Sequence, residues 1–466
     1  MKKTKPVDWL FFGALFLLFL LPPYDPDLGW QLRCGEIIWQ RQGFCSLNQF
    51  SVLLANYAWP NYYWLYQTII FPLFRLAGLW GLTLFNALLM SLAFFFFYQA
   101  IPNYRWEKML AVGLVIFFSW GVFSLGIRSQ LLGFFFLSLL LWLLPEIEKK
   151  PKLAAFLPLI TLVWANSHGS VIIGLILLLF WGIKETIKQP KRFLFWLIIL
   201  FSTTAFTLLN PFGFKIYQVA WHHFAGVKLS GLIAEWVPPN KAIWWLILLS
   251  GLAFSFYSLF NSLPVLAFAF LALKARRNVP LYFLLFFYLL FFLPQTKKWL
   301  GTWLQKKDLR KGLAALTATL ILSFSLVFQL PLAFNTNASW QNYCQKSRLG
   351  YPCQAVEFLR NQPEKGVIFN RYEWGGFLIW QLPEYQIFVD GRMPAWPTLS
   401  GKSPYTIYLE TLQTRTGWQE TLEKYGIDWI LISPGTYMDL LLQPEPKNFG
   451  WQETFRDNVS AVYKKL

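Results

Sequence analysis

Residues 79–100 read LWGLTLFNALLMSLAFFFFYQA, an apolar run without a single charged side chain. A transmembrane helix needs about 20 consecutive, mostly apolar residues, so this run predicts a membrane span. Similar runs recur along the chain, near residues 9–22, 107–125, 130–145, 152–167, 169–184, 193–209, 242–259, 262–274, 279–294 and 311–332. We therefore expect a polytopic α-helical membrane protein with about eleven spans.

The composition agrees with a membrane protein. Hydrophobic residues make up 56% of the chain and charged residues only 14%, whereas a soluble chain carries roughly 25% charged residues. The first apolar block follows Lys2, Lys3 and Lys5, as a signal peptide would. Pro22, Pro23 and Tyr24 follow it instead of a small-residue cleavage site, so we interpret the block as a retained anchor.

The net charge of +18 lies entirely in the membrane part. Residues from Ala333 onward contain 13 basic and 13 acidic side chains, which leaves 28 basic and 10 acidic ones before them. The basic residues cluster in short polar breaks, at Lys149-Lys150-Lys152, Lys184/Lys188/Lys191/Arg192, Lys297-Lys298 and Lys306-Lys307-Arg310-Lys311. Cytoplasmic loops of membrane proteins carry such an excess. The charge therefore indicates a cytoplasmic N-terminus and an extracytoplasmic C-terminal part, and no nucleic-acid partner.

Three polar stretches fall on the outer side. They are a first loop at residues 24–78, a second loop from Asn210 to Lys241, and the C-terminal tail. We divide the chain into a transmembrane module, residues 1–332, which includes the first loop, and an extracytoplasmic α/β domain, residues 333–466. In the tail the pattern predicts strands and helices in alternation: strands at Val367–Phe369, Ile387–Val389 and Trp429–Ile432, and helices at Tyr405–Leu412 and Trp418–Tyr425.

All four cysteines fall on the predicted outer side, in two closely spaced pairs. Disulfides persist in oxidising compartments, so we expect the bridges Cys34–Cys45 and Cys344–Cys353. The alternative is four unpaired thiols.

Few carboxylates face outward. They are Asp25, Asp27, Glu36 and Glu235. Sugar transfer to a hydroxyl needs a carboxylate to accept its proton, or a metal held by carboxylates, so Asp25, Asp27 and Glu235 are the candidate catalytic residues. The alternative for Asp25-Pro26-Asp27 is a solvated acidic turn, and for Glu235 it is a salt bridge such as one to Lys241.

Polar side chains also collect at the predicted outer ends of spans. They are Arg128, Gln130, Asn166, His168, Arg276 and Arg277. Arginine donates two parallel hydrogen bonds that suit a phosphate, so this group is a candidate site for the phosphate of a lipid carrier. Contact with ordinary phospholipid headgroups is the alternative.

Several motifs together carry a resemblance to a known family. They are Asp25-Pro26-Asp27-Leu28 with Gly35, Asn48-Gln49-Phe50-Ser51 and Trp59, then Arg128-Ser129-Gln130, Trp164-Ala165-Asn166-Ser167-His168-Gly169, Asn210-Pro211-Phe212-Gly213 and Glu235-Trp236, and in the tail Asn370-Arg371-Tyr372-Glu373-Trp374-Gly375-Gly376 and Phe388-Val389-Asp390-Gly391-Arg392. With them the chain resembles bacterial multispan proteins related to the GT-C glycosyltransferases, the fold class of protein mannosyltransferases and oligosaccharyltransferases. Where relatives often carry an aromatic pair and a histidine after the acidic pair, this chain has Gly29-Trp30-Gln31.

The resemblance implies a catalytic centre at the acidic first loop, a polyprenyl-phosphate-linked sugar as donor, and inversion at the anomeric carbon. Asp25 or Asp27 would then be the general base, or the ligand of a divalent cation such as Mg²⁺ or Mn²⁺. Trp374, Asp390 and Arg392 are weaker candidates for binding a glycan, lipid or protein acceptor.

We therefore predict an inverting membrane glycosyltransferase of the bacterial cytoplasmic (inner) membrane. Two other hypotheses stay open. One is a glycan polymerase or ligase that uses a diphosphate-linked donor. The other is a non-catalytic transporter or envelope scaffold, although no inverted repeat typical of a transporter is evident.

Overall fold

The computed structural model describes residues 6–102, 105–221, 233, 235–256, 259–292, 307–346, 350–394, 396 and 401–466. The chain divides into two compact units. The helical unit comprises Met1–Pro23, Ala77–Ala220 and Lys228–Phe334, and the mixed unit comprises Tyr24–Leu76, Trp221–Val227 and Asn335–Leu466. The first loop thus groups with the tail, which the sequence did not suggest.

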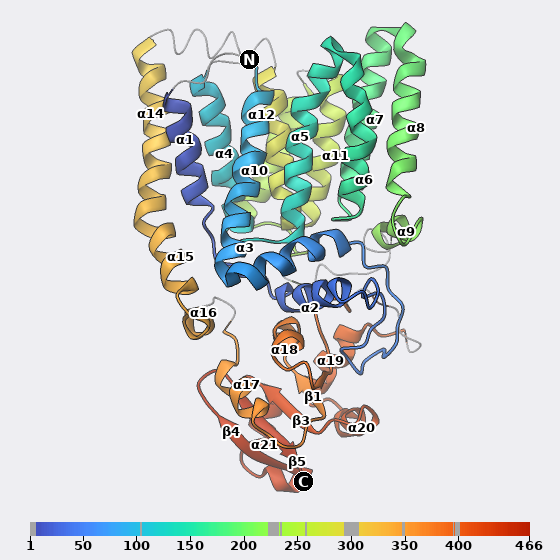
Figure 1. Cartoon of the computed structure of the whole chain (residues 1–466), viewed down its shortest axis with the longest axis vertical. Coiled ribbons are helices and arrows are strands. Elements are labelled where there is room, and N and C mark those ends of the chain that lie inside the picture. Colours follow the sequence, from blue (N-terminus) through green and yellow to red (C-terminus); the bar gives the residue numbers. More distant parts are fainter. Residues whose placement is uncertain are drawn as a thin grey trace. The chain divides into compact units, whose positions relative to one another are not determined.

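The helical unit is a bundle of apolar helices (Figure 1). Its long helices are α1 (Pro6–Leu18), the second part of α3 (Trp64–Ala100), α4 (Arg105–Phe123), α5 (Ser129–Lys149), α6 (Phe156–Ala165), α7 (Val171–Lys188), α8 (Phe193–Thr207), α10 (Lys241–Ser255), α11 (Leu259–Lys274), α12 (Val279–Phe292) and α14 (Lys307–Phe324). Shorter elements are η1 (Pro151–Ala155), η2 (Pro190–Arg192), α9 (Lys215–Trp221), η5 (Arg276–Asn278), η6 (Ser325–Gln329) and α15 (Leu330–Asn337), which continues into the mixed unit.

Each of the eleven predicted spans corresponds to a helix or to a helix continued by a short turn. In the described part of the chain, four helices are long and apolar enough to cross a membrane by themselves: Trp64–Ala100, Arg105–Phe123, Ser129–Lys149 and Gly312–Asn337. Others are apolar but shorter, such as Pro6–Leu18 and Lys241–Ser255. The count of eleven spans therefore stays a prediction.

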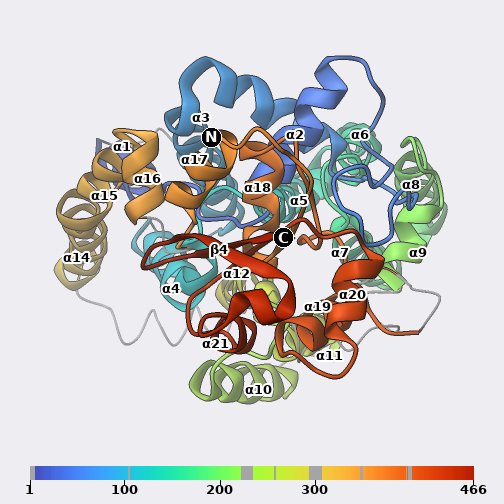
Figure 2. The same ribbon diagram turned by 90° about the horizontal axis from the view of Figure 1, so that it is seen from below.

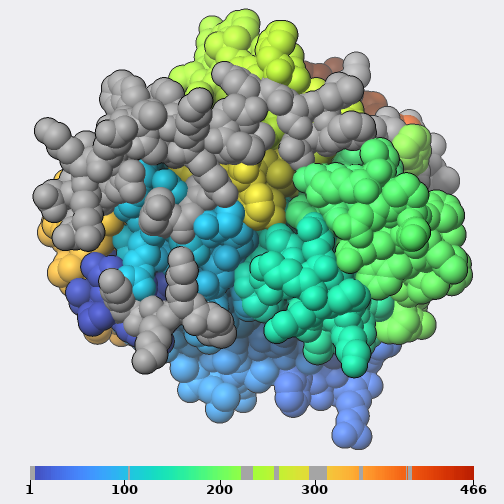
Figure 3. Space-filling model, turned by 90° about the horizontal axis from the view of Figure 1, so that it is seen from above, coloured from blue at the N-terminus to red at the C-terminus, as the bar shows by residue number. Residues whose placement is uncertain are grey.

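The basic links lie together at one end of the helical unit. The α5–α6 link contains Lys150 and Lys152, and the α7–α8 link contains Lys191 and Arg192. Figure 1 shows both links at the same end of the bundle. Figure 3 looks onto that end, where the helices joined by these links are coloured teal and green. The basic residues Lys297, Lys298 and Lys306 lie outside the described residues.

Helix α3 is broken at Ala77 and Gly78, where the two units meet along the chain. Gly78 has a φ of 55°, in the left-handed region that a residue with a side chain rarely adopts. The break coincides with the predicted end of the first loop, so the apolar run of residues 79–100 begins directly after it.

The mixed unit contains a five-stranded sheet with the order β2-β1-β3-β5-β4. Its strands are β1 (Val367–Asn370), β2 (Gln386–Ile387), β3 (Trp429–Ile432), β4 (Trp451–Arg456) and β5 (Ala461–Lys465). The pairs β1–β2 and β1–β3 are parallel, whereas β3–β5 and β4–β5 are antiparallel. The predicted strands Val367–Phe369 and Trp429–Ile432 are confirmed as β1 and β3. The predicted strand Ile387–Val389 shares only Ile387 with β2, and β4 and β5 were missed.

Helices flank this sheet. They are α16 (Trp340–Lys346), α17 (Cys353–Arg360), η7 (Tyr372–Trp374), α18 (Gly375–Gln381), α19 (Pro404–Leu412), α20 (Trp418–Lys424), α21 (Tyr437–Leu442) and η8 (Pro446–Phe449). Figure 2 shows α17 and α18 to one side of β4 and α21 and α19 to the other. The predicted helices at Tyr405–Leu412 and Trp418–Tyr425 are confirmed as α19 and α20.

The first loop folds against the tail within this unit. Ser51 forms a parallel bridge with Ile387, so the loop continues the sheet beyond β2. Helix α2 (Leu28–Trp39) packs against α18. Both predicted disulfides are present, Cys34–Cys45 in the loop and Cys344–Cys353 in the tail.

Candidate functional site

The acidic turn forms the start of α2 in the mixed unit. The backbone N–H of Asp27 donates a 3.2 Å hydrogen bond to Oδ1 of Asp25, and the carbonyl oxygen of Asp25 accepts one from the N–H of Leu28. Asp25 is 4% exposed, whereas Asp27 is partly exposed. Asp25 therefore shapes the turn, and Asp27 is the more exposed of the two carboxylates.

Two buried tyrosines lie beside this turn, and sequence reasoning missed them. Burial and the negative charge of Asp25 raise the pKa of both Tyr343 and Tyr351 well above the usual phenol value. The hydroxyl of Tyr351 lies 3.5 Å from the carbonyl oxygen of Asp25. The disulfide Cys344–Cys353 joins the segments that carry them. Both phenols are thus neutral hydrogen-bond donors next to the acidic turn.

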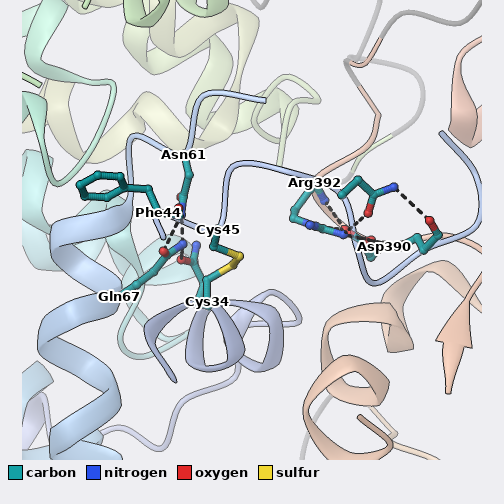
Figure 4. Close-up of a disulfide and its surroundings, with 10 residues drawn as sticks. Cys34, Phe44, Cys45, Asn61, Gln67, Asp390 and Arg392 are labelled. Carbon is teal, nitrogen blue, oxygen red and sulfur yellow. Dashed lines mark hydrogen bonds and ion pairs between the residues drawn. A yellow bond between two sulfur atoms is a disulfide. The ribbon is translucent and has the colours of Figure 1, made fainter. Parts of the chain in front are cut away.

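Asp390 and Arg392 form a buried ion pair in the tail. Nε of Arg392 lies 2.8 Å from Oδ1 of Asp390, and the two side chains are 1% and 0% exposed. Nη2 of Arg392 also donates to Oδ1 of Asn48, and Oγ of Ser51 donates to Asp390 (Figure 4). Burial would raise the pKa of Asp390, but the charge and hydrogen bonds of Arg392 and the bond from Ser51 hold that pKa below its usual value.

The tail motifs around Trp374 and Asp390 are buried within the mixed unit. Trp374 is fully buried, and its indole N–H donates to the carbonyl oxygen of Gly350. Asp390 and Arg392 are committed to each other and to the first loop. The predicted acceptor contacts of these three residues therefore gain no support from this geometry.

Glu235 gathers polar side chains from two parts of the helical unit, the start of α5 and η5. Its carboxylate lies 2.8 Å from Nη2 of Arg128 and 3.1 Å from Nη1 of Arg277, and it accepts a 3.1 Å hydrogen bond from Gln130. Burial would raise the pKa of Glu235, but the two arginines and the amide hold it at about 2. The guanidinium of Arg277 also lies over the ring of Trp236. The expected salt bridge exists, with arginines as the partners.

His168 lies in the turn between α6 and α7. Its Nδ1 accepts a 3.0 Å hydrogen bond from the backbone N–H of Ser170, and the hydroxyl of Ser170 in turn accepts one from the indole of Trp164. Burial, together with the charges of Arg277 and Arg128, lowers the pKa of His168 to about 3, while the charge of Glu235 opposes this shift. His168 is therefore neutral near pH 7, with its proton on Nε2.

Two further candidates occupy different surroundings. Nδ2 of Asn166 donates to the carbonyl oxygens of Leu162 and Leu209, so this amide joins the ends of α6 and α8. Arg276 is exposed, and within the described part of the chain its guanidinium has no ion pair or hydrogen bond. The structure thus brings three of the six predicted phosphate-site residues, Arg128, Gln130 and Arg277, to Glu235, a grouping that the sequence did not predict.

Solved structures of an archaeal enzyme share this architecture. The oligosaccharyltransferase AglB of Archaeoglobus fulgidus, in complex with an inhibitory peptide and a dolichol-phosphate, has a TM-score of 0.56 and 12% sequence identity, covering 91% of this chain and 69% of AglB. The chain has a GT-C fold. A second structure of the A. fulgidus oligosaccharyltransferase, with Zn and sulfate, has a TM-score of 0.56 and 13% identity, covering 98% of this chain and 73% of the enzyme.

The GT-C fold and the four long apolar helices make the chain a multi-pass membrane protein. No protein-family model matches the sequence, and no curated protein matches it either. A third structure of the archaeal enzyme holds an acceptor peptide tethered by a disulfide bond. At 11–13% identity these likenesses establish the fold of this chain.

Among the residues that the structure describes, no group of three His, Cys, Asp or Glu side chains could hold a metal ion. Asp25 and Asp27 supply two carboxylates. A Mg²⁺ ion is often held by one or two carboxylates together with substrate phosphates, so these two fit a metal only when a substrate completes the site.

Proposed function

We propose that the protein is a membrane glycosyltransferase that moves a sugar from a polyprenyl-phosphate donor to a lipid, glycan or protein acceptor. The observation that carries this proposal is the acidic turn of a GT-C chain, in which Asp25 is buried and Asp27 is partly exposed. A general base must have a carboxylate that the acceptor can reach. Asp27 meets this requirement.

In the proposed reaction the acceptor hydroxyl attacks the anomeric carbon of the donor. The bond between that carbon and the phosphate oxygen breaks, and its electron pair leaves with the polyprenyl phosphate. Asp27 accepts the hydroxyl proton. Attack from the face opposite the phosphate inverts the anomeric centre. A divalent cation, if one takes part, would lie at Asp25 and Asp27 and would neutralise phosphate charge.

The leaving phosphate needs positive charge, and we assign this role to Arg276, Arg277 and Arg128. Arg276 is exposed and has no ion pair within the described residues, which supports a direct contact with phosphate. Glu235 already binds Arg128 and Arg277. A carboxylate with a pKa of about 2 is a weak base at neutral pH, so we infer that Glu235 balances the charge of these arginines and does not accept the acceptor's proton. Gln130 and His168 support the same cluster.

We also propose the predicted topology in the bacterial cytoplasmic membrane. The basic links at one end of the helical unit support a cytoplasmic position for that end. The two disulfides support an oxidising compartment for the mixed unit. Transfer would then take place on the extracytoplasmic face.

Binding of the lipid carrier is tested by native mass spectrometry of the purified protein with polyprenyl monophosphate. We expect binding that the Arg276→Ala/Arg277→Ala variant loses and that Lys241→Ala, which removes another exposed cation of the helical unit, retains. Binding no stronger than that of ordinary phospholipid would favour the transporter or scaffold hypothesis. A preference for polyprenyl diphosphate carriers would favour the polymerase or ligase hypothesis.

Catalysis is tested with a radiolabelled polyprenyl-phosphate hexose and membrane extract as the source of acceptors. Asp27→Asn should abolish transfer while the protein stays folded, because an amide cannot accept the proton. The matched control is Glu373→Gln, which alters an exposed carboxylate of the mixed unit. Full activity of folded Asp27→Asn protein would remove Asp27 from the mechanism.

A further inference from the structure

The backbone of Gly391 lies against the carboxylate of Asp27 within the mixed unit. A Cβ added to Gly391 would lie 1.9 Å from Oδ1, 3.0 Å from Cγ and 3.5 Å from Oδ2 of Asp27. These are the three nearest heavy atoms, and all belong to the Asp27 side chain. The φ of Gly391 is outside the left-handed region, so close approach, not an unusual dihedral, excludes a side chain there.

Gly391 is itself held firmly. It stands between Asp390 and Arg392, whose buried ion pair is bonded to Asn48 and Ser51 of the first loop. Figure 4 shows this pair beside the loop. A group that packs against the backbone of Gly391 therefore meets a rigid surface.

Other glycines bring the same turn close to the tail. A Cβ on Gly376 would lie 2.3 Å from the carbonyl oxygen of Pro26, and one on Gly29 would lie 1.9 Å from the carbonyl oxygen of Gly376. A Cβ on Gly375 would lie 2.7 Å from Cα of Asp390. The tail backbone at Gly376 thus lies against the backbone at Pro26 and Gly29, which flank Asp27 in the sequence.

We propose that Gly391 is a positioning residue for the sugar-transfer reaction, and that it fixes the orientation of the Asp27 carboxylate. This proposal rests on the proposed role of Asp27 as general base. The backbone of Gly391 occupies the space beside Oδ1 of Asp27, so the carboxylate cannot rotate toward the tail. The Trp-Gly-Gly and Asp-Gly-Arg motifs then serve catalysis without touching a substrate, which gives the tail a function that needs no acceptor contact.

The substitution Gly391→Ala tests this proposal because the three atoms nearest to the added methyl group all belong to the Asp27 carboxyl group. It should displace the carboxylate and leave the fold intact. We expect kcat for transfer from a polyprenyl-phosphate hexose to fall by roughly a hundredfold, as for small misplacements of catalytic groups. The KM for the donor should stay unchanged. Gly121→Ala, whose added Cβ would meet no atom within 4 Å, is the control and should keep the wild-type kcat.

A double-mutant cycle of thermal unfolding tests the contact between Gly391 and Asp27 without an activity assay. Gly391→Ala should lower the melting temperature of the wild-type protein, and should lower it by less than half as much in an Asp27→Ala background, where the obstructing oxygen is absent. Equal shifts in the two backgrounds, or an unchanged kcat in Gly391→Ala, would overturn the positioning role. If Gly391→Ala lowers the melting temperature more in the wild-type background than in the Asp27→Ala background, but the wild-type protein transfers no sugar, the contact is supported and the proposed function is refuted.

Discussion

Ser51 donates a 2.6 Å hydrogen bond to Asp390, although 339 residues separate the two positions. The same carboxylate pairs with Arg392, which in turn donates to Asn48. The first loop and the tail therefore share one buried polar network. This network is the firmest link between residues that the sequence assigned to different domains.

We expect Arg392→Ala to destabilise the mixed unit strongly. The substitution leaves the Asp390 carboxylate buried without its counter-charge, and removing one partner of a buried ion pair costs about 3–5 kcal/mol. The apparent melting temperature in detergent measures the effect. Lys402→Ala, which breaks the exposed pair Lys402–Glu410, should cost less than about 1 kcal/mol. Equal effects of the two substitutions would show that the buried pair contributes little.

Glu235→Gln should strengthen the binding of polyprenyl monophosphate. The substitution removes the negative charge that Arg128 and Arg277 now share. One unit charge about 8–16 Å from the phosphate is worth about 1–2 kcal/mol at an effective dielectric of about 20, or about five- to thirtyfold in affinity. Native mass spectrometry measures the change, with Glu410→Gln as control. Weaker binding by Glu235→Gln would instead indicate that the carboxylate holds the arginines in a binding geometry.

Acid should destabilise the helical unit through His168. The pKa of His168 is about 3 in the folded protein and about 6.5 in an unfolded chain, so the unfolded state binds the proton more tightly. Stability is therefore complete above about pH 6.5 and declines toward pH 3, by about 2 kcal/mol between pH 6.5 and 5. Melting temperatures of wild type and His168→Gln over this range measure the effect. A decline of the same size in His168→Gln would assign it to other groups.

Loss of the Cys34–Cys45 bridge should destabilise the first loop. The bridge closes a short loop with a sequence separation of 11, which corresponds to roughly 2–3 kcal/mol in the chain-entropy model. We expect Cys34→Ser/Cys45→Ser to melt at a lower temperature than the wild type. A reducing agent should not destabilise the first loop of this variant further. Cysteine accessibility to a maleimide in the non-reduced wild type provides the check. Rapid labelling of Cys34 would contradict the bridge.

Local sequence patterns predicted several features of the fold, namely an apolar helix, a core strand and the cysteine pairs. The apolar run at residues 79–100 begins directly after the break at Gly78, because a membrane span and a left-handed glycine both leave marks in the sequence. The core strand Trp429–Ile432 was predicted at its observed bounds, since all four residues are buried and apolar. The cysteine pairs were predicted because close spacing on one side of the membrane favours pairing.

Long-range contacts were not predictable in the same way. Gly375, Gly376 and Gly391 read equally well as turn residues. In the structure Gly376 and Gly391 lie against the turn at Pro26 and Asp27, and Gly375 lies against Val389 and Asp390 of the tail. Tyr343 and Tyr351 carry no motif, so their position beside Asp25 could not be inferred. The strands β4 and β5 were missed because Trp451–Arg456 is half-polar and lies at the edge of the sheet. The sequence thus named candidate charged residues, whereas the residues that pack against them could not be inferred from it.

The grouping of the first loop with the tail sets an order of assembly. Residues 24–76 are synthesised early, yet their partners in the sheet and in α18 follow some three hundred residues later. Contacts between such distant segments form slowly because a long intervening chain must first be closed. The edge at Phe50–Val52 must therefore persist unpaired while the helices of the membrane part are made. The disulfide Cys34–Cys45 lies wholly inside the early segment, so it can form first and keep that segment compact until the ribosome releases the tail.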